Sequence, residues 1–78
     1  MKIKVYSMQS CPYCHMAKDL LTANKIHFED IDISNDSQAA MEMVQKSGQR
    51  GVPVIDIDGK IIVGFDKEKI LMSIRGLS

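Results

Sequence analysis

The residues best suited to chemistry are the two cysteines of the segment SCPYCH, which occupies positions 10–15. Cys11 and Cys14 have the Cys-x-x-Cys spacing, which in an α/β chain is typical of a dithiol that cycles through a disulfide. The same spacing followed directly by a histidine, here His15, is also the attachment motif of a c-type haem. The elements around the motif therefore have to decide which chemistry it serves.

The composition of the chain argues against several broad classes of protein. The 78 residues suit one small domain, residues 1–78, which buries only about 60% of its unfolded surface. Apolar residues make up 45% of the chain, as in a globular domain, and ten basic side chains balance ten acidic ones. A net charge of zero gives no electrostatic support for a nucleic-acid or membrane partner. Two cysteines are too few for the disulfide scaffold of a secreted miniprotein.

The sequence also predicts where the protein works. The segment MKIKVYSMQS at the N-terminus has no apolar run long enough for a signal peptide. No stretch approaches the roughly 20 apolar residues of a membrane helix. We therefore expect a cytoplasmic protein, in which an exposed Cys-x-x-Cys pair is more often catalytic or metal-binding than structural.

The motif lies between an expected strand and an expected helix. Residues 2–6 alternate between polar and apolar side chains, which favours a strand. A helical period begins at Cys11, and its apolar face consists of Met16, Ala17, Leu20 and Leu21. Pro12 suits the first helical position, because the N–H that proline lacks would have no intrahelical partner there. Cys11 is thereby placed at or beside the N-cap of the helix.

A second strand and a second helix are expected next. The strand is predicted over residues 26–33. N-cap oxygens for the helix are offered by Ser34, Asn35 and Asp36, and Gly48 would end it. The apolar face of this helix consists of Ala39, Ala40, Met43 and Val44. The methionines at helical positions are expected to fill the core.

The last third of the chain predicts a hairpin and a third helix. Residues 52–57 and 60–63 flank Asp58-Gly59, which is a strong two-residue hairpin signal. Asp66 is expected to cap the last helix, whose inward face consists of Ile70, Leu71 and Ile74. In the order β-α-β-α-β-β-α, the strand–helix–strand unit implies a parallel pair and the hairpin an antiparallel pair. We therefore predict an α/β protein with a mixed four-stranded sheet covered by three helices.

The position of Cys11 makes it the better nucleophile of the two cysteines. A thiolate attacks a disulfide, and an ordinary cysteine is only about 3% ionised at neutral pH. Unpaired N–H groups and the macrodipole at a helix N-terminus favour negative charge. Cys14, one turn further along, feels this field less but is close enough to form a disulfide with Cys11. We expect Cys11 to attack and Cys14 to resolve the mixed disulfide.

Other interpretations of the motif remain open: two ordinary half-buried cysteines, a metal or iron–sulfur site, and haem attachment. Two thiolates fall short of four metal ligands, so His15, a second chain or an outside thiol would have to complete a site. A 2Fe–2S cluster bridged between two chains is the main rival. Haem would need a large apolar pocket and a sixth ligand such as Met8 or Met41, and its attachment normally takes place outside the cytoplasm. We expect no permanently bound cofactor and no metal.

The chain resembles a known family. CPYC after a first strand, GVPV at residues 51–54 and VGFDKEKI at residues 63–70 are similar to the motifs of glutaredoxins and of glutaredoxin-like, NrdH-type redoxins with the thioredoxin fold. These three motifs, in this order, span nearly the whole chain. The resemblance implies that Cys11 is the nucleophile, Cys14 the resolving thiol and Pro53 a cis-proline opposite the dithiol.

The resemblance also implies a groove that binds glutathione or an extended peptide. The backbone of Val52 would pair with either ligand as an added strand. The loop that holds the γ-glutamyl end of glutathione in glutaredoxins corresponds to Gly64, Phe65 and Asp66. Gln49 and Arg50 lie where a donor would meet the glycyl carboxylate, and Tyr13 would lie at the rim of the site.

Two positions depart from the family pattern. Glutaredoxins commonly carry a lysine three residues before the first cysteine, near the thiolate and the glutathione carboxylate, and this chain has Met8 there. Threonine usually precedes the Val-Pro pair, and here the residue is Gly51. Phe65 resembles the glycine–phenylalanine loop of NrdH-type redoxins, which take electrons from thioredoxin reductase and serve ribonucleotide reductase. We therefore expect weaker glutathione binding than in a typical glutaredoxin.

These inferences combine into one expected function. We predict a monomeric dithiol–disulfide oxidoreductase that reduces protein disulfides or glutathione mixed disulfides through Cys11 and Cys14. The resemblance implies that its electrons come from glutathione or from thioredoxin reductase. Its expected partners are disulfide-containing proteins, with ribonucleotide reductase among them, and its expected roles are electron transport and cell redox homeostasis.

Overall fold

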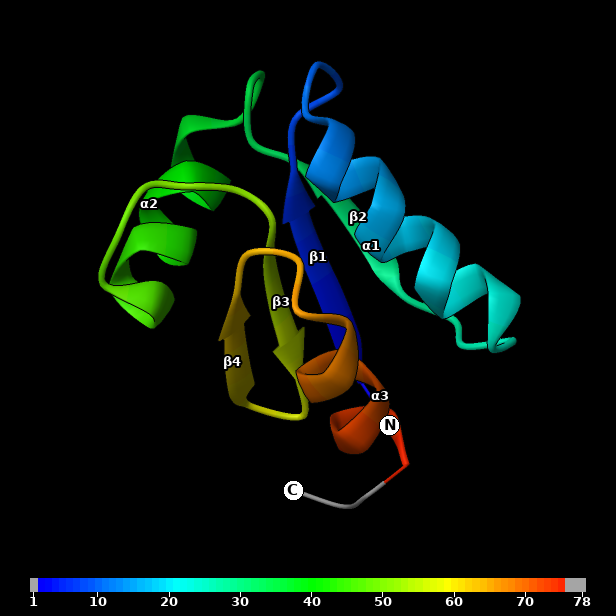
Figure 1. The fold of residues 1–78 in the computed structure, drawn as a ribbon. Coiled ribbons are helices and arrows are strands. Elements are labelled where there is room, and N and C mark those ends of the chain that lie inside the picture. The colour runs from blue at the N-terminus through cyan, green and yellow to red at the C-terminus, as the bar shows by residue number, and fades with distance from the viewer. Residues whose placement is uncertain (1, 76–78) are drawn as a thin grey trace.

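The computed structural model describes residues 2–75 of the chain (Figure 1). The elements follow the predicted order: β1 (Ile3–Ser7), α1 (Pro12–Ala23), β2 (Glu29–Asp32), α2 (Ser37–Ser47), β3 (Val54–Ile57), β4 (Lys60–Val63) and α3 (Lys67–Ile74). None of these helices has the length and the apolar character needed to cross a lipid bilayer.

A mixed four-stranded sheet with the strand order β2-β1-β3-β4 forms the centre of the molecule. β1 runs parallel to β2 and antiparallel to β3, and β4 pairs antiparallel with β3. The β3–β4 hairpin turns at Asp58 and Gly59, whose φ angles are both positive, 51° and 93°. An Asp-Gly pair tolerates this backbone, which matches the twist of the two strands. The predicted α/β class and the mixed sheet are therefore confirmed.

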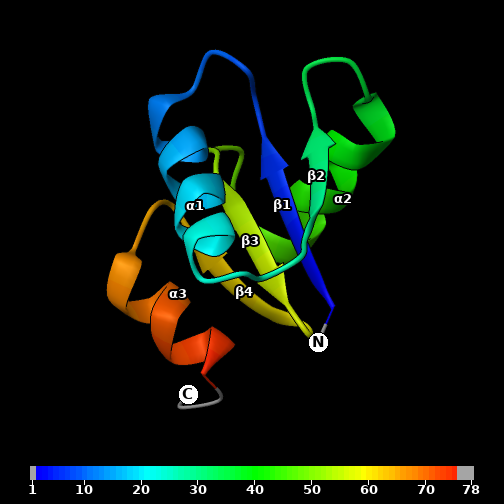
Figure 2. The same ribbon diagram turned by 90° about the vertical axis from the view of Figure 1, so that its right-hand side faces the viewer.

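The helices cover both faces of the sheet, with α1 and α3 on one face and α2 on the other (Figure 2). Successive side chains of a strand point to opposite faces, so β1 contributes to two cores. The core under α1 and α3 consists of Ile3, Val5, Ala17, Leu21, Ile55, Ile57, Ile62 and Ile70. The core under α2 consists of Tyr6, Met43 and Val54, with half-buried apolar side chains around them.

Each helix begins at a residue whose side chain accepts a backbone hydrogen bond. Asp36 Oδ1 accepts from the Ala39 N–H at 3.0 Å, and Asp66 Oδ1 accepts from the Lys69 N–H at 3.1 Å. These contacts satisfy donors that a helix start otherwise leaves unpaired. α2 ends at Gly48 in the left-handed conformation, with φ of 74°. Of the three predicted N-cap candidates for the second helix, Asp36 is the one used, and the caps predicted at Gly48 and Asp66 are confirmed.

Two strands are shorter than predicted. β2 begins at Glu29 and not at residue 26, because the Ile26 N–H donates to the Leu21 carbonyl at 2.9 Å and so continues the end of α1. β3 begins at Val54 and not at residue 52. Pro53 has no N–H to donate to the sheet ladder, so regular pairing starts one residue after it.

The prediction that the helical methionines fill the core is wrong for three of them. Met43 is buried, but Met16, Met41 and Met72 are 45%, 64% and 48% exposed. Met16 was also predicted on the inner face of the first helix. α1 contacts the sheet along a narrow stripe whose buried members are Cys14, Ala17 and Leu21, and Met16 lies beside that stripe.

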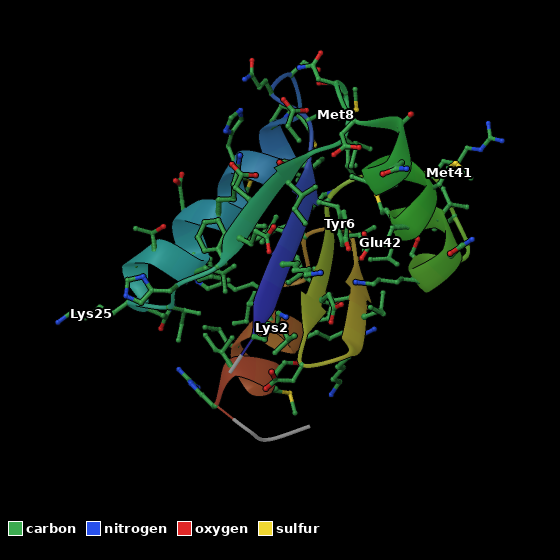
Figure 3. The ribbon with its side chains drawn as sticks, turned by 180° about the vertical axis from the view of Figure 1, so that it is seen from behind. Lys2, Tyr6, Met8, Lys25, Met41 and Glu42 are labelled. Atoms are coloured by element: carbon green, nitrogen blue, oxygen red, sulfur yellow. The ribbon has the colours of Figure 1, made fainter. Side chains whose placement is uncertain are left out.

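A polar network joins α2 to the sheet beneath it. The Tyr6 hydroxyl donates to Glu42 at 2.9 Å, and these two side chains lie next to each other in Figure 3. Lys46 Nζ donates to the Tyr6 hydroxyl at 2.9 Å and to Asp56 at 2.8 Å, and it lies 3.1 Å from Glu42. Because Tyr6 and Asp56 belong to β1 and β3, the Lys46 side chain connects α2 to both central strands.

Candidate redox-active site

Cys11 is the N-cap residue of α1, with an extended backbone conformation (φ −99°, ψ 110°), and Pro12 is the first helical residue. The Cys11 sulfur accepts a hydrogen bond from the Cys14 N–H at 3.3 Å. The Cys11 N–H in turn donates to the Met8 carbonyl at 3.1 Å, which holds the loop between β1 and α1. The sulfur therefore lies at the positive end of the helix dipole, as the sequence predicted.

Cys14 lies one turn into α1 and has a different environment. Its side chain is completely buried, whereas Cys11 is partly exposed. Burial, together with the neighbouring Cys11 sulfur, raises the pKa of the Cys14 thiol to about 11. A substrate can therefore reach Cys11 from solvent, while Cys14 waits beneath it as a neutral thiol.

The segment before β3 lies against the dithiol. The Val52–Pro53 peptide bond is cis, and Pro53 is buried. The Cys11 thiol faces the Val52 carbonyl oxygen at a distance of 3.9 Å. The cis-proline that the resemblance implied opposite the dithiol is therefore confirmed.

The loop before α3 adjoins the same segment. The Gly64 N–H donates to the Pro53 carbonyl at 2.8 Å, which joins this loop to the cis-proline. Phe65 is half-buried and packs against the core under α1 and α3. Asp66 caps α3 through Oδ1. The structure thus brings Val52, Pro53 and Gly64 together beside Cys11.

Tyr13 and Arg50 are both exposed side chains. Tyr13 follows Cys11 by two residues and is 61% exposed, which agrees with a place at the rim of the site. Arg50 is exposed and lines a groove along α2 with Ile33, Ala40, Met41, Met43, Val44 and Gln45. That lining does not include the dithiol or the cis-proline loop. Arg50 therefore belongs to the lining of the groove along α2, and its role toward a glycyl carboxylate stays a prediction.

The Gln49 side chain is used within its own loop. Its Oε1 accepts the Gly51 N–H, and its Nε2 donates to the Gly51 carbonyl at 2.9 Å. A Cβ atom on residue 51 would lie 2.7 Å from that Oε1. Gly51, one of the two departures from the family pattern, thus leaves room for the Gln49 side chain in the conformation that it adopts here.

The sequence interpretation missed three polar side chains near Cys14. The Ser7 hydroxyl donates to Asp30 Oδ1 at 2.8 Å, and Lys18 Nζ contacts Asp30 Oδ2 at 3.1 Å. Ser7 is 2% exposed although it is polar. The one available signal was the position of Lys18 four residues after Cys14, which places both on the same face of a helix.

His15 and the metal alternatives can be judged from the same geometry. His15 is exposed, and its Nε2 hydrogen-bonds to the Gln9 carbonyl at 2.7 Å. Over residues 2–75, the His, Cys, Asp and Glu side chains form no group of three or more that could hold a metal ion. The residues that do converge on Cys11 are a second thiol and backbone groups, a set that suits thiol–disulfide exchange.

Comparison with known proteins agrees with this chemistry. The glutaredoxin family model matches residues 3–62. An uncharacterised glutaredoxin-like 8.6 kDa protein in the rubredoxin operon of Clostridium pasteurianum is 47% identical over 68 residues, which cover 87% of this chain and 91% of that protein. Glutaredoxin 3 of Escherichia coli (strain K12) is 38% identical over 64 residues, which cover 82% of this chain and 77% of that protein.

Solved structures show the same similarity. The glutaredoxin-like NrdH-redoxin from Escherichia coli superposes with a TM-score of 0.81 at 27% identity, covering 91% of this chain and 92% of that one. That redoxin has a thioredoxin-like activity profile.

Proposed function

The chain belongs to the glutaredoxin family and has its thioredoxin-like fold, and from this premise we propose that it reduces disulfides by a two-cysteine mechanism at Cys11 and Cys14. The family and the fold support thiol–disulfide oxidoreductase activity. The observation that carries the two-cysteine mechanism is the contrast between the partly exposed Cys11 and the buried Cys14 directly behind it in the same helical turn.

The reaction takes place in two exchange steps. The Cys11 thiolate attacks one sulfur of the substrate disulfide, so that a mixed disulfide forms and the other substrate sulfur leaves as a thiolate. The Cys14 thiolate then attacks the Cys11 sulfur, forms the Cys11–Cys14 disulfide and displaces the second substrate sulfur. Both displaced thiolates take up protons, and two electrons have passed from the dithiol to the substrate.

The substrate chain is proposed to lie along the segment before β3. Its backbone would pair with Val52 as a short added strand, which places a substrate sulfur near Cys11. The contact of 3.9 Å between the Cys11 thiol and the Val52 carbonyl supports this position. Tyr13, exposed on the helix beside the dithiol, would pack on the substrate from the other side.

The source of electrons and the targets are further parts of the proposal. Glutathione and thioredoxin reductase are the two reductants to be compared, and disulfide-containing proteins, ribonucleotide reductase among them, are the targets. The apolar Met8 on the loop before Cys11 offers no charge to a glutathione carboxylate, which favours protein disulfides as the better substrates. We place this reaction in the cytoplasm, with the chain acting as a monomer.

Cysteine variants test the two-cysteine mechanism. Cys11→Ser is expected to abolish reduction of protein disulfides and of glutathione mixed disulfides, because the attacking sulfur is lost. Cys14→Ser is expected to accumulate a mixed disulfide with a protein substrate, visible by intact mass, while it still turns over a small glutathione mixed disulfide. Reduction of protein disulfides by Cys14→Ser at the parent rate would rule out the mechanism.

Redox equilibration distinguishes the reductants. The pure protein is equilibrated with a series of reduced-to-oxidised glutathione ratios, quenched in acid, alkylated and weighed by mass spectrometry. A two-electron transition with a small population of glutathione adduct would support glutathione as the reductant. A dithiol that stays oxidised in strongly reducing glutathione buffer would support thioredoxin reductase, and the absence of any transition would contradict the oxidoreductase proposal.

A further inference from the structure

The second exchange step poses a physical problem at Cys14. The attacking group has to be a thiolate, yet the Cys14 side chain is completely buried. In the reduced protein, burial and then the Cys11 thiol raise the pKa of Cys14 to about 11, and the burial remains when Cys11 carries a substrate. A fixed positive charge near the Cys14 sulfur would stabilise the thiolate and speed this step.

Ser7, Asp30 and Lys18 form a polar cluster between α1 and the sheet. Lys18 Nζ lies 3.1 Å from Asp30 Oδ2, and Asp30 Oδ1 accepts the buried Ser7 hydroxyl at 2.8 Å. The Lys18 side chain is only 18% exposed, whereas the Asp30 side chain is 48% exposed. Asp30 therefore faces water on one side and holds the Lys18 ammonium against the sheet on the other.

This cluster lies on the same face of the sheet as Cys14. Val5 and Asp30 are direct partners in the β1–β2 ladder, and Val5 belongs to the core under α1, so Asp30 points to that side. Ser7 is two residues from Val5 and shares its face. Lys18 follows Cys14 by four residues, which puts the two side chains one above the other on α1.

The groups that raise or lower the pKa of Cys14 come from α1, its N-cap and the loop after β1. Cys11 on α1 raises the pKa of Cys14, while the backbone N–H of Met8, after β1, and the charge of Lys18 lower it. Asp30 on β2 is the counter-charge of Lys18. Val52 and Pro53, which face the dithiol from the loop before β3, carry no charge. Among these groups Lys18 is the cation, and its charge lowers the pKa of Cys14 by less than burial and Cys11 raise it.

We propose that Lys18 is a positioning residue for the second exchange step: its ammonium, held in place by Asp30 and Ser7, stabilises the negative charge on the Cys14 sulfur as that sulfur attacks Cys11. The proposal rests on the two-cysteine mechanism proposed above. The proton of Cys14 passes to buffer base, the Cys14–Cys11 bond forms, and the bond from Cys11 to the substrate sulfur breaks. Lys18 itself gives up no proton.

A single-turnover experiment with a symmetric nitroaromatic disulfide separates the two steps. The first coloured thiolate is released when Cys11 attacks the probe, and the second is released when Cys14 attacks the Cys11 mixed disulfide. Lys18→Met keeps the length of the side chain and removes its charge. We expect this variant to slow the second release about three- to tenfold at neutral pH, since one pKa unit changes the thiolate fraction tenfold.

The pH profile and the control variants make the result specific. In Lys18→Met the second release should shift to higher pH while the first release stays at the parent rate. Lys18→Arg should restore the parent profile, Lys18→Gln should behave like Lys18→Met, and Lys67→Met, an exposed lysine on α3, should change neither step.

Two outcomes would overturn different parts of the argument. A parent protein that releases only one thiolate per chain lacks the second exchange step, and the two-cysteine mechanism itself then fails. In the other outcome, the parent releases two thiolates, and the second release in Lys18→Met and Lys18→Gln matches the parent in rate and pH dependence. That result would overturn the role of Lys18 and leave the two-cysteine mechanism in place. Equal slowing of both releases would assign Lys18 to general stability and would also overturn that role.

Discussion

At the scale of single residues, the site depends on giving two identical side chains opposite surroundings. Cys11 lies at the N-cap, half in solvent, where its sulfur accepts the Cys14 N–H. Cys14 is buried on α1, and burial raises the pKa of its thiol, so that it is protonated in the reduced protein at neutral pH. This asymmetry supports the proposed order of attack, because Cys11 is the sulfur that is exposed to solvent.

Met8 is the residue at which the choice of reductant can be tested. The Met8 carbonyl accepts the Cys11 N–H, so a lysine introduced at position 8 would extend from the loop that holds Cys11, the proposed nucleophile. Met8→Lys is expected to raise turnover of a glutathione mixed disulfide about two- to fivefold at low salt, the effect of one solvent-exposed ion pair. Met72→Lys, which adds the same charge to an exposed position on α3, should leave turnover unchanged.

Salt provides the internal check on the Met8 prediction. The gain in Met8→Lys should shrink as ionic strength rises, because exposed charges are screened over about 10 Å at 0.1 M salt. A gain that does not depend on salt, or an equal gain in Met72→Lys, would show that glutathione is not recognised through a charge at position 8.

At the scale of elements, α2 is attached to the sheet by charge as well as by packing. Although its burial alone would raise the pKa of Asp56, hydrogen bonds from Lys46 and from the Gly59 N–H lower it below the ordinary value. For Lys46, burial alone would lower the pKa, and its bonds to Asp56, Tyr6 and Glu42 outweigh this and raise it. Both groups are therefore charged in the folded protein at neutral pH.

Removal of the Lys46 charge should loosen α2. Lys46→Met is expected to reduce the free energy of unfolding by about 1 kcal/mol at neutral pH, because Asp56, which is 13% exposed, loses its cation. The loss is modest because the Lys46–Asp56 pair in the parent is partly solvated. Urea unfolding measures the loss. The control Lys69→Met removes an exposed lysine on α3 and should be nearly neutral.

The pH dependence of this loss follows from the sign of the Asp56 shift. An aspartate with a lowered pKa in the folded state stabilises the protein above its unfolded pKa, about 3.9, and loses that contribution as the pH falls through the folded pKa. The difference between the parent and Lys46→Met should therefore be largest near neutral pH and shrink in acid. A difference that grows in acid would contradict this account.

At the scale of the whole molecule, the free energy of unfolding is small, and the protonation state of the buried Cys14 thiol affects it. A domain of this size buries a smaller share of its surface than larger domains, so a change of 1 or 2 kcal/mol is a large part of about 5 kcal/mol in total. In the reduced protein, the raised pKa of Cys14 means that the folded state binds its proton more tightly than the unfolded chain does.

The reduced protein should consequently lose stability in alkali. A group with a raised folded pKa contributes fully below its unfolded pKa, about 8.5 for cysteine, and its contribution is lost as the pH rises toward about 11. The expected loss from Cys14 is about 1–2 kcal/mol by urea unfolding. Burial also raises the pKa of Tyr6, so Cys14→Ser serves as the reference that isolates the cysteine.

Parent and Cys14→Ser should therefore diverge between neutral and alkaline pH under reducing conditions. The stability of the parent should fall more steeply, because only the parent carries the thiol that burial keeps protonated. Parallel curves for the two proteins would contradict the assignment of the alkaline loss to Cys14.

The element order and the dithiol could be predicted because their signals are local. Each of these signals involves only residues that are close in the sequence. They are the Cys-x-x-Cys spacing, Pro12 at the first helical position, the caps at Asp36 and Asp66, and the Asp58-Gly59 turn. The ends of β2 and β3 were less predictable, because Ile26 pairs back with α1 and Pro53 delays the ladder. The prediction for Met16 was wrong because the helical period alone does not tell how wide a face of α1 is buried against the sheet.

The sequence by itself determined the two thiols and their place at the start of a helix, since their spacing and Pro12 are local signals, but it left iron–sulfur and haem chemistry open. Only the tertiary structure decided what surrounds them. Val52, Gly64 and Asp30 come from three separate segments, and no period or spacing in the chain relates them to Cys11 and Cys14. Lys18 is related to Cys14 by the helical spacing of four residues, but its contact with Asp30 depends on the sheet. Strand pairing brings these segments together, because the parallel β1–β2 and antiparallel β1–β3 registers set which side chains share a face.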